Sequence, residues 1–324
     1  MHYDFCTLFD RNYLFRGLAL HESLERHVHD FTLYILCMDD TVHHVLQRMQ
    51  LAQVELIALA DFEDDELLRA KATRSHVEYC WTCTPSLPLY LLDRVPGITT
   101  ATYLDADLYF FADPAPVFTE MESSSVGMVG HRYSHDLEYL AEDYGIYNVE
   151  FMVFRNDERA RDCLVWWRER CNEWCYGRVE DGKYGDQKYL DVWPERFEGV
   201  VVLETKGAGL APWNLRRYNV TRTHGRIGVN GQPLIFFHYH SFTIGSDGRN
   251  YRPCLWVYGA EGREYRFLFR PYWAAVKRAM RRTRLVAPGY AYGFSSERIP
   301  SPARRFAGRV RRRVGRLVRS SEAG

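Results

Sequence analysis

The sequence lacks the features of a membrane-spanning or cleaved segment. No run of about 18 apolar residues occurs, so no transmembrane helix is expected. The apolar stretch that opens the chain is interrupted by Asp4 and Asp10, which favours a first strand over a signal peptide. With 46% hydrophobic residues among 324, the chain can nevertheless bury a substantial core. The sequence therefore predicts a globular protein.

Cysteine is too sparse for a disulfide scaffold, since eight residues are spread over the whole chain. This usage fits a reducing cytoplasm. Cys80 and Cys83, together with Cys171 and Cys175, offer four thiolates for a zinc ion, but their apolar and aromatic neighbours suit ordinary buried cysteines as well. The sequence leaves both interpretations open.

The chain also has no net charge, but its basic and acidic residues are distributed unevenly along the sequence. From Lys277 to the end there are 14 basic and two acidic side chains, so this part carries +12 and the preceding 276 residues carry −12. Apolar residues within it recur at spacings of four, four and three, and on a helix they form one stripe flanked by arginines (Phe306, Val310, Val314 and Leu317). We expect either an interfacial helix on an anionic membrane or a solvated basic tail.

Strand-like and helix-like stretches alternate over the first hundred residues. Strands are predicted over 3–9, 31–38, 54–59 and 99–104, and helices over 13–27, 41–50, with Thr41 as its cap, and 87–95. Later strands are expected over 125–130, 149–154, 200–204 and 233–242, and a helix opened by Asp157 over 157–176. This order predicts an α/β fold whose mostly parallel sheet has helices on both faces.

Composition divides the chain into three segments. They are a main domain over 1–245, an extension packed on it over 246–275, and a basic, amphipathic helical tail over 276–324. We expect the protein in the cytoplasm, peripheral to the cytoplasmic membrane face.

Two aspartates follow the strand expected over 99–104. Asp105 and Asp107 stand where the backbone turns at the carboxyl end of that strand, so both can reach one ion. Carboxylate oxygens suit Mg²⁺ or Mn²⁺, which bridge protein carboxylates to substrate phosphates. The pair therefore suggests a metal-diphosphate site, although an Asp-x-Asp alone is also typical of turns and helix caps.

The pair belongs to an ordered set of motifs, which are YLDADLYFFADP, YNVEFMVFRND, YGDQKYLDVWPERF and FFHYHSF. This set resembles bacterial nucleotide-diphosphosugar glycosyltransferases of the GT-A type, in particular family 8-like and family 77-like enzymes. The resemblance covers residues 3–242 and implies a Rossmann-like α/β domain.

The resemblance implies a metal site of Asp105, Asp107 and His238, with His240 as the competing third ligand. It places the nucleotide base and ribose near the end of the first strand, at Thr7, Phe9, Asp10 and Tyr13, although a core phenylalanine and a cap aspartate would look the same. Lys71 or Arg74 can neutralise a donor phosphate, or belong to a solvated helix face.

The same resemblance locates the reaction centre at Asp186 or Gln187, where an oxygen can shield positive charge on the anomeric carbon. Glu150 departs from the family, in which glycine is usual, and is expected either at the acceptor side as a second carboxylate or in a structural pair with Arg155. Acceptor contacts are predicted at Asn148, Trp213 and Asn214, although Trp213 suits a satellite core equally well.

The resemblance thus implies a metal-dependent, retaining transferase for cell-surface polysaccharide or lipopolysaccharide synthesis. Its partners would be a nucleotide-diphosphate sugar, most naturally a UDP-sugar, a glycan or lipid-linked acceptor, and the membrane surface, without nucleic acid. A sugar-nucleotide pyrophosphorylase is disfavoured because FDRNYLFRG follows the first strand in place of a Gly-rich loop. A haloacid-type phosphatase would carry its aspartates after the first strand. A basic-tail adaptor that binds membranes or RNA without catalysis remains the rival from another class.

Overall fold

The protein, seen in a computed structural model, is described over residues 2–262 and 264–299. Its centre is a seven-stranded sheet with the order β3-β2-β1-β4-β7-β6-β8. Within it β7 alone runs against its neighbours, so the predicted mostly parallel sheet is confirmed. The strands are β1 (Tyr3–Phe9), β2 (Phe31–Cys37), β3 (Val54–Ala58), β4 (Thr100–Leu104), β6 (Val126–Gly130), β7 (Tyr147–Arg155) and β8 (Val200–Leu203).

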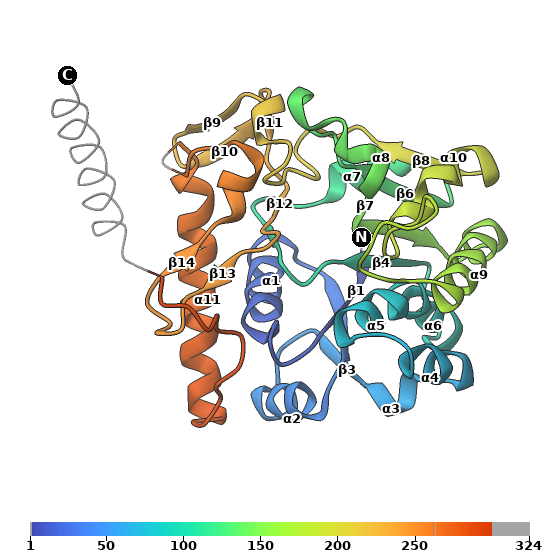
Figure 1. Ribbon diagram of the computed structural model, residues 1–324, viewed down its shortest axis with the longest axis horizontal. Coiled ribbons are helices and arrows are strands. Elements are labelled where there is room, and N and C mark those ends of the chain that lie inside the picture. Colours follow the sequence, from blue (N-terminus) through green and yellow to red (C-terminus); the bar gives the residue numbers. More distant parts are fainter. Residues whose placement is uncertain (1, 263, 300–324) are drawn as a thin grey trace, which may run out of the picture.

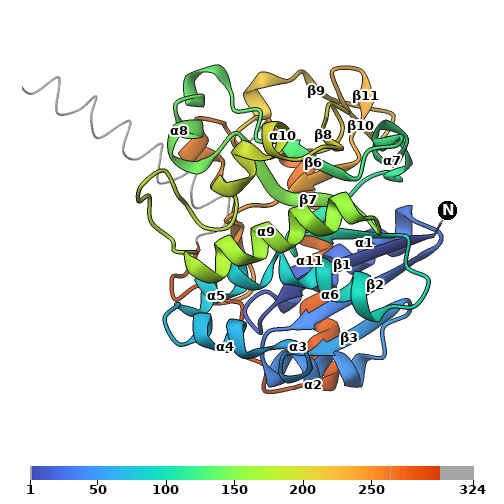
Figure 2. The ribbon, with the colours of Figure 1, turned by 90° about the vertical axis from the view of Figure 1, so that its right-hand side faces the viewer.

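Helices cover both faces of this sheet, as predicted (Figure 1). One face packs Phe5 and Ile35 against α1 (Leu14–His27), α2 (Asp40–Met49) and α11 (Arg266–Val286). The opposite face packs Leu8 and Leu36 against a second layer, in which α9 crosses the side turned to the viewer in Figure 2. The helices of that layer are α4 (Asp65–Lys71), α5 (His76–Cys83), α6 (Ser86–Arg94) and α9 (Glu158–Glu173).

Shorter elements complete the fold. The strands β5 (Leu108–Phe110) and β12 (Phe236–His238), far apart in the chain, pair antiparallel beside the main sheet. The other strands are β9 (Val220–Thr223), β10 (Arg226–Val229), β11 (Gln232–Pro233), β13 (Thr243–Ile244) and β14 (Tyr251–Arg252). The other helices are α3 (Leu59–Phe62), α7 (Ala115–Met121), α8 (Leu140–Tyr144) and α10 (Trp193–Arg196), with 3₁₀ turns over His135–Leu137, Lys188–Val192, Leu215–Arg217 and Cys254–Tyr258.

Two predicted helix starts have different outcomes. Asp157 caps α9 as expected, because its carboxylate accepts from the backbone N–H of Ala160 at 2.9 Å. The cap predicted at Thr41 is wrong. Asp39 caps α2 instead by accepting from the N–H of Val42 at 2.9 Å, and Thr41 lies inside the first turn.

The long helix α11 lies beside α1 and crosses the boundary expected between residues 275 and 276. Its apolar side continues past that boundary, since Val276, Ala279, Met280 and Thr283 are buried. The first part of the expected tail is therefore a packed helix. The predicted stripe from Phe306 to Leu317 lies outside the described residues. No helix in the described ranges is long and apolar enough to cross a bilayer.

Candidate metal centre

The two aspartates lie on the turn that joins β4 to β5. Asp105 follows the last residue of β4, and its backbone N–H donates to the carbonyl of Glu150 on β7 at 2.9 Å, so it extends the sheet by one residue. Asp107 immediately precedes β5. Its carbonyl accepts from the N–H of Tyr239 at 3.0 Å, which anchors the turn to the end of β12. The pair thus lies beside the carboxyl ends of both β4 and β12.

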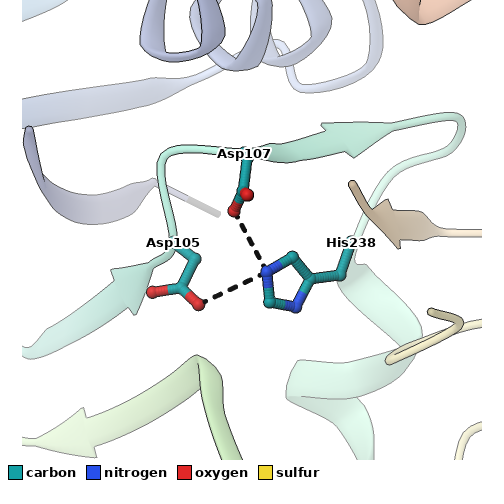
Figure 3. A group of neighbouring side chains, drawn as sticks. All are labelled: Asp105, Asp107 and His238. Atoms are coloured by element: carbon teal, nitrogen blue, oxygen red, sulfur yellow. Dashed lines mark ion pairs between the residues drawn. The ribbon is translucent and has the colours of Figure 1, made fainter. Parts of the chain in front are cut away.

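His238 is the last residue of β12 and pairs with Leu108 of β5. This antiparallel register carries its imidazole to the two aspartates, although some 130 residues separate them in sequence. Its Nε2 lies 3.0 Å from Oδ1 of Asp107 and 3.6 Å from Oδ2 of Asp105 (Figure 3). One ligand atom from each of the three residues lies within 4.8 Å of the others.

The carboxylates and the imidazole shift one another's protonation. Burial raises the pKa of Asp105 to about 6 against the opposing effect of His238. Burial also opposes ionisation of Asp107, but His238, with smaller contributions from His240 and Arg16, outweighs it and lowers the pKa of Asp107. For His238, burial disfavours the imidazolium, yet Asp107 and Glu150 hold its pKa well above the usual range.

This donor set fits a divalent cation. Two carboxylates and one imidazole nitrogen face a common point at the sheet edge, and Asp107 and His238 are buried. Mg²⁺ and Mn²⁺ bind carboxylate oxygens, and imidazole suits the borderline metals of the first transition row. Without a cation, the imidazole supplies the positive charge that the carboxylates need.

Two curated proteins of Bacillus subtilis (strain 168) are similar in sequence. YfnD is 32% identical over 295 residues, which cover 90% of this chain and 94% of YfnD. YfnF is 36% identical over 247 residues, which cover 74% of this chain and 82% of YfnF. The chain belongs to the YfnD and YfnF family. Both relatives are described as uncharacterized, and no family model matches this chain.

Several solved structures share part of the chain course at low identity. The galactosyltransferase LgtC, in complex with donor and acceptor sugar analogues, has 15% identity and a TM-score of 0.47 over 74% of this chain and 87% of its own. Mouse xyloside xylosyltransferase 1 has 12% identity and a TM-score of 0.46 over 74% and 98%. GlyE of Streptococcus pneumoniae has 14% identity and a TM-score of 0.44 over 91% and 65%. At these TM-scores the functional argument rests on the site itself.

His240, the competing ligand, is not in the group formed by Asp105, Asp107 and His238. Its ring lies edge-on to Trp213 at 5.5 Å, and burial together with His238 lowers its pKa to about 4. Of the two histidines, the structure therefore brings His238 to the aspartates.

Glu150 lies against the histidine of the metal group and not against Arg155. It is 1% exposed, and Oε2 accepts from Nδ1 of His238 at 2.6 Å. The pairing with Arg155 is wrong, because Arg155 donates to the carbonyls of Ser124 and Glu122. Asn148, also buried, accepts from the backbone N–H of Glu150 at 3.0 Å and so supports it.

Trp213 and Asn214 lie behind the site. Trp213 is buried edge-on to His238 and donates its indole N–H to the carbonyl of His131 at 2.9 Å. The amide of Asn214 donates to the carbonyls of His131 and Gly209 and accepts from the N–H of Ala211. Since a fully buried, fully bonded amide cannot touch an acceptor in this conformation, the structure gives these residues a supporting place.

Asp186 and Gln187 lie in the segment before the turn Lys188–Val192. Burial, and then Asp105, raises the pKa of Asp186 to about 7, which places its carboxyl within electrostatic reach of the aspartate pair. Gln187 donates its side-chain amide to the carbonyl of Tyr144 at 2.8 Å. Asp186 is thus the member of this pair that the structure links to the metal centre.

Of the residues predicted to bind the nucleotide, some are buried in the core and others lie nearer the surface. Thr7 and Phe9 are buried, and Phe9 belongs to the main hydrophobic core, so neither presents a surface to a base. Asp10 accepts from the N–H groups of Asn12 and Tyr13 and caps the turn before α1. Tyr13 is 41% exposed. Tyr13 is therefore the aromatic side chain of this group that is open to a ligand.

Arg16 is a residue that the sequence interpretation missed. It is buried, and its guanidinium lies over the ring of Tyr13 at 4.4 Å and donates to the carbonyls of Asn12 and Phe242. Among the described residues, no hydrogen-bond acceptor meets its Nε. The helical period gave no signal for its burial, because position 16 lies on the other side of a helix from Leu14 and Leu18, and α1 is buried on both sides here.

The expected phosphate cations already have protein partners. Lys71 pairs with Glu63 at 2.6 Å. Arg74 bonds to the hydroxyl of Tyr176 and to the carbonyls of Asn172 and Glu173 at the end of α9. Their role in phosphate binding stays a prediction.

The eight cysteines are free thiols. Six of them are buried, and Cys80 packs partly buried against the core. In the part of the chain that the structure describes, the aspartate and histidine group is the one cluster with metal-ligand geometry. The zinc interpretation of the cysteine pairs therefore has no support in the arrangement of the side chains.

Proposed function

We propose that this protein is a metal-dependent glycosyltransferase that moves a sugar from a nucleotide-diphosphate donor to a hydroxyl group of an acceptor. One observation carries the proposal. Asp105 and Asp107 meet His238, which lies about 130 residues further along the sequence, at the carboxyl edge of a mostly parallel sheet. Ligands of open α/β sheets bind at this edge.

Different residues around this centre would bind different parts of the donor. A divalent cation held there would neutralise charge on the leaving diphosphate. Arg16 supplies a second, permanent positive charge beside Asp107, suited to a phosphate oxygen. Tyr13, exposed on the same side and stacked on Arg16, offers its ring to the nucleotide base.

Asp186 supplies an oxygen on the other side of the donor. When ionised, its carboxylate stabilises the positive charge that develops on the anomeric carbon as the bond to the diphosphate breaks. Gln187 is adjacent and keeps its amide oxygen for a second contact, since its amide N–H is bonded to Tyr144. This arrangement supports bond cleavage at the sugar carbon.

The finer assignments are part of the same proposal. They are a UDP-linked donor, retention of anomeric configuration, Mn²⁺ or Mg²⁺ as the cation, and a glycan or lipid-linked acceptor of cell-surface polysaccharide synthesis at the cytoplasmic membrane face. Their support is the resemblance of the ordered motifs. A non-catalytic adaptor would have no use for a buried metal centre, and a pyrophosphorylase needs a triphosphate loop that FDRNYLFRG does not provide.

Calorimetric titration with UDP, in the presence and absence of Mn²⁺, tests the proposal. We expect tight binding only with Mn²⁺, and a loss of at least about tenfold in Asp105→Asn and Asp107→Asn, because each removes an anionic ligand. Asp113→Asn is the matched control. It lies in the same segment but accepts from the N–H of Ala115 at the start of α7, so UDP binding should stay normal. Unchanged Mn²⁺-dependent binding in both site variants would contradict the proposal.

A further inference from the structure

A buried carboxylate lies directly behind the metal centre. Glu150 occupies the middle of β7, next to β4, and its side chain is 1% exposed. Its Oε2 is 2.6 Å from Nδ1 of His238, while the opposite ring nitrogen, Nε2, faces Asp107 and Asp105. The imidazole is thus held between one carboxylate behind and two in front.

The hydrogen bond decides which ring nitrogen can bind a cation. An ionised carboxylate only accepts hydrogen bonds, so the Nδ1 that meets Glu150 carries a proton. The lone pair for a metal then belongs to Nε2, the nitrogen that faces the aspartates. Glu150 is itself held by the N–H···Oδ1 bond to Asn148 and by its place in the middle of the sheet, so it is a rigid partner.

We infer that Glu150 is a positioning residue of the metal centre, which orients His238 through Nδ1 and strengthens Nε2 as a ligand. The inference rests on the proposed metal site but not on the sugar chemistry. A carboxylate behind a ligating histidine fixes the ring and raises its basicity, and losing such a partner typically lowers metal affinity about 10- to 100-fold. It also explains why a charged residue is kept at a fully buried strand position, where burial alone would disfavour it.

Mn²⁺ alone is the probe, and the EPR signal of free aqueous Mn²⁺ measures its binding without nucleotide or turnover. We expect Glu150→Gln, which keeps the shape and an acceptor oxygen but removes the charge, to lower Mn²⁺ affinity about tenfold, and Glu150→Ala up to about 100-fold. Glu63→Gln is the matched control. Glu63 is also a mostly buried, hydrogen-bonded carboxylate, but its partners are Lys71 and Tyr79.

A double-mutant cycle separates positioning from a general structural effect. If Glu150 acts through the imidazole, Glu150→Gln should change Mn²⁺ affinity by less than about twofold once His238 is replaced by alanine. Thermal unfolding without metal checks that each variant is folded, and the near-isosteric glutamine keeps the test valid if the alanine variant is not. The inference is overturned if Glu150→Gln and Glu150→Ala bind Mn²⁺ like the wild type, or if the effects of Glu150 and His238 simply add. Failure of UDP binding alongside normal Mn²⁺ binding would count against the proposed function instead.

Discussion

Asp186 shows how burial sets the properties of a single side chain near the metal centre. It is 7% exposed, and its pKa is raised from the ordinary 3.8 to about 7 by burial and by the charge of Asp105. Between these values the folded protein keeps a proton that the unfolded chain has released. Stability must therefore fall as the pH rises from about 4 to 7, and stay reduced above that range.

Asp186→Asn should remove this pH dependence. In metal-free protein we expect the variant to match the wild type near pH 4 and to be more stable at pH 8, by up to ~4 kcal/mol, because asparagine needs no buried charge. Urea unfolding at the two pH values measures the difference. A stability gain that is the same at both values would show that Asp186 does not titrate in this window.

Arg16 is a positively charged residue of the proposed donor site, to which the acidic Asp186 also belongs. Arg16→Met should lower the affinity for UDP with Mn²⁺ by about tenfold or more, because a hydrogen bond between charged groups contributes roughly 1.5–3 kcal/mol. Calorimetry gives the affinity. Arg26→Met is the control, since Arg26 lies at the end of the same helix and pairs with Glu22. Normal UDP affinity in Arg16→Met would exclude a phosphate contact.

At the scale of elements, the approach of α1 to β1 is closer than a side chain would permit. A Cβ added at Gly17 would lie 2.3 Å from the ring of Phe9, so glycine lets the helix pack on the end of the first strand. Arg16 and Tyr13 project from this helix start. The position of Arg16 and Tyr13, which are proposed to bind the nucleotide, therefore depends on the small size of Gly17.

Gly17→Ala should cost about 1–3 kcal/mol of stability, because the ring of Phe9 or the helix must shift in a well-packed core. Denaturant unfolding measures the loss. Gly289→Ala is the matched control, since among the residues that the structure describes no atom apart from its chain neighbours lies within 4 Å of the added methyl group, and stability should hardly change. Equal stability of the two variants would mean that Phe9 moves aside without strain.

At the scale of the whole molecule, α11 connects the domain to the basic end of the chain. Its buried residues extend beyond residue 275, and Arg278 pairs with Glu22 of α1. A chain ending at Ala275 would lose half of a packed helix, so any test of the basic tail must keep residues up to Ile299, which is also buried.

The full chain should float with anionic vesicles at moderate salt, and a chain ending at Ile299 should not. Each basic residue near an anionic leaflet contributes about 1 kcal/mol before screening, and residues 300–324 contain eight arginines and one acidic residue. Flotation on phosphatidylserine vesicles, with neutral vesicles as the control, measures binding. If both chains behave alike, the tail has no part in membrane binding, and the metal centre is unaffected by that result.

Local sequence patterns were sufficient to predict the order and type of the main elements and the position of the aspartate pair. Apolar periodicity reports local backbone geometry, and strands such as Phe31–Cys37 keep that geometry in the fold. The carboxyl end of β4 could likewise be predicted, because the apolar pattern of the strand stops where the Asp-x-Asp motif begins. Local signals were weaker at helix starts, where Asp39 and Thr41 compete as caps within three residues.

The side chains that meet the aspartate pair could not be predicted in this way, because they depend on long-range packing. His238 and not His240 reaches the aspartates because His238 is the last residue of β12 and pairs with Leu108 of β5, whereas His240 lies beyond the end of that strand. Glu150 faces His238, Trp213 is buried behind it, and the charge of Arg16 lowers the pKa of Asp107, since each position depends on packing between segments far apart in the chain. The sequence specifies the identity of these residues. The orientation of their side chains depends on contacts between distant segments, which no local sequence pattern encodes.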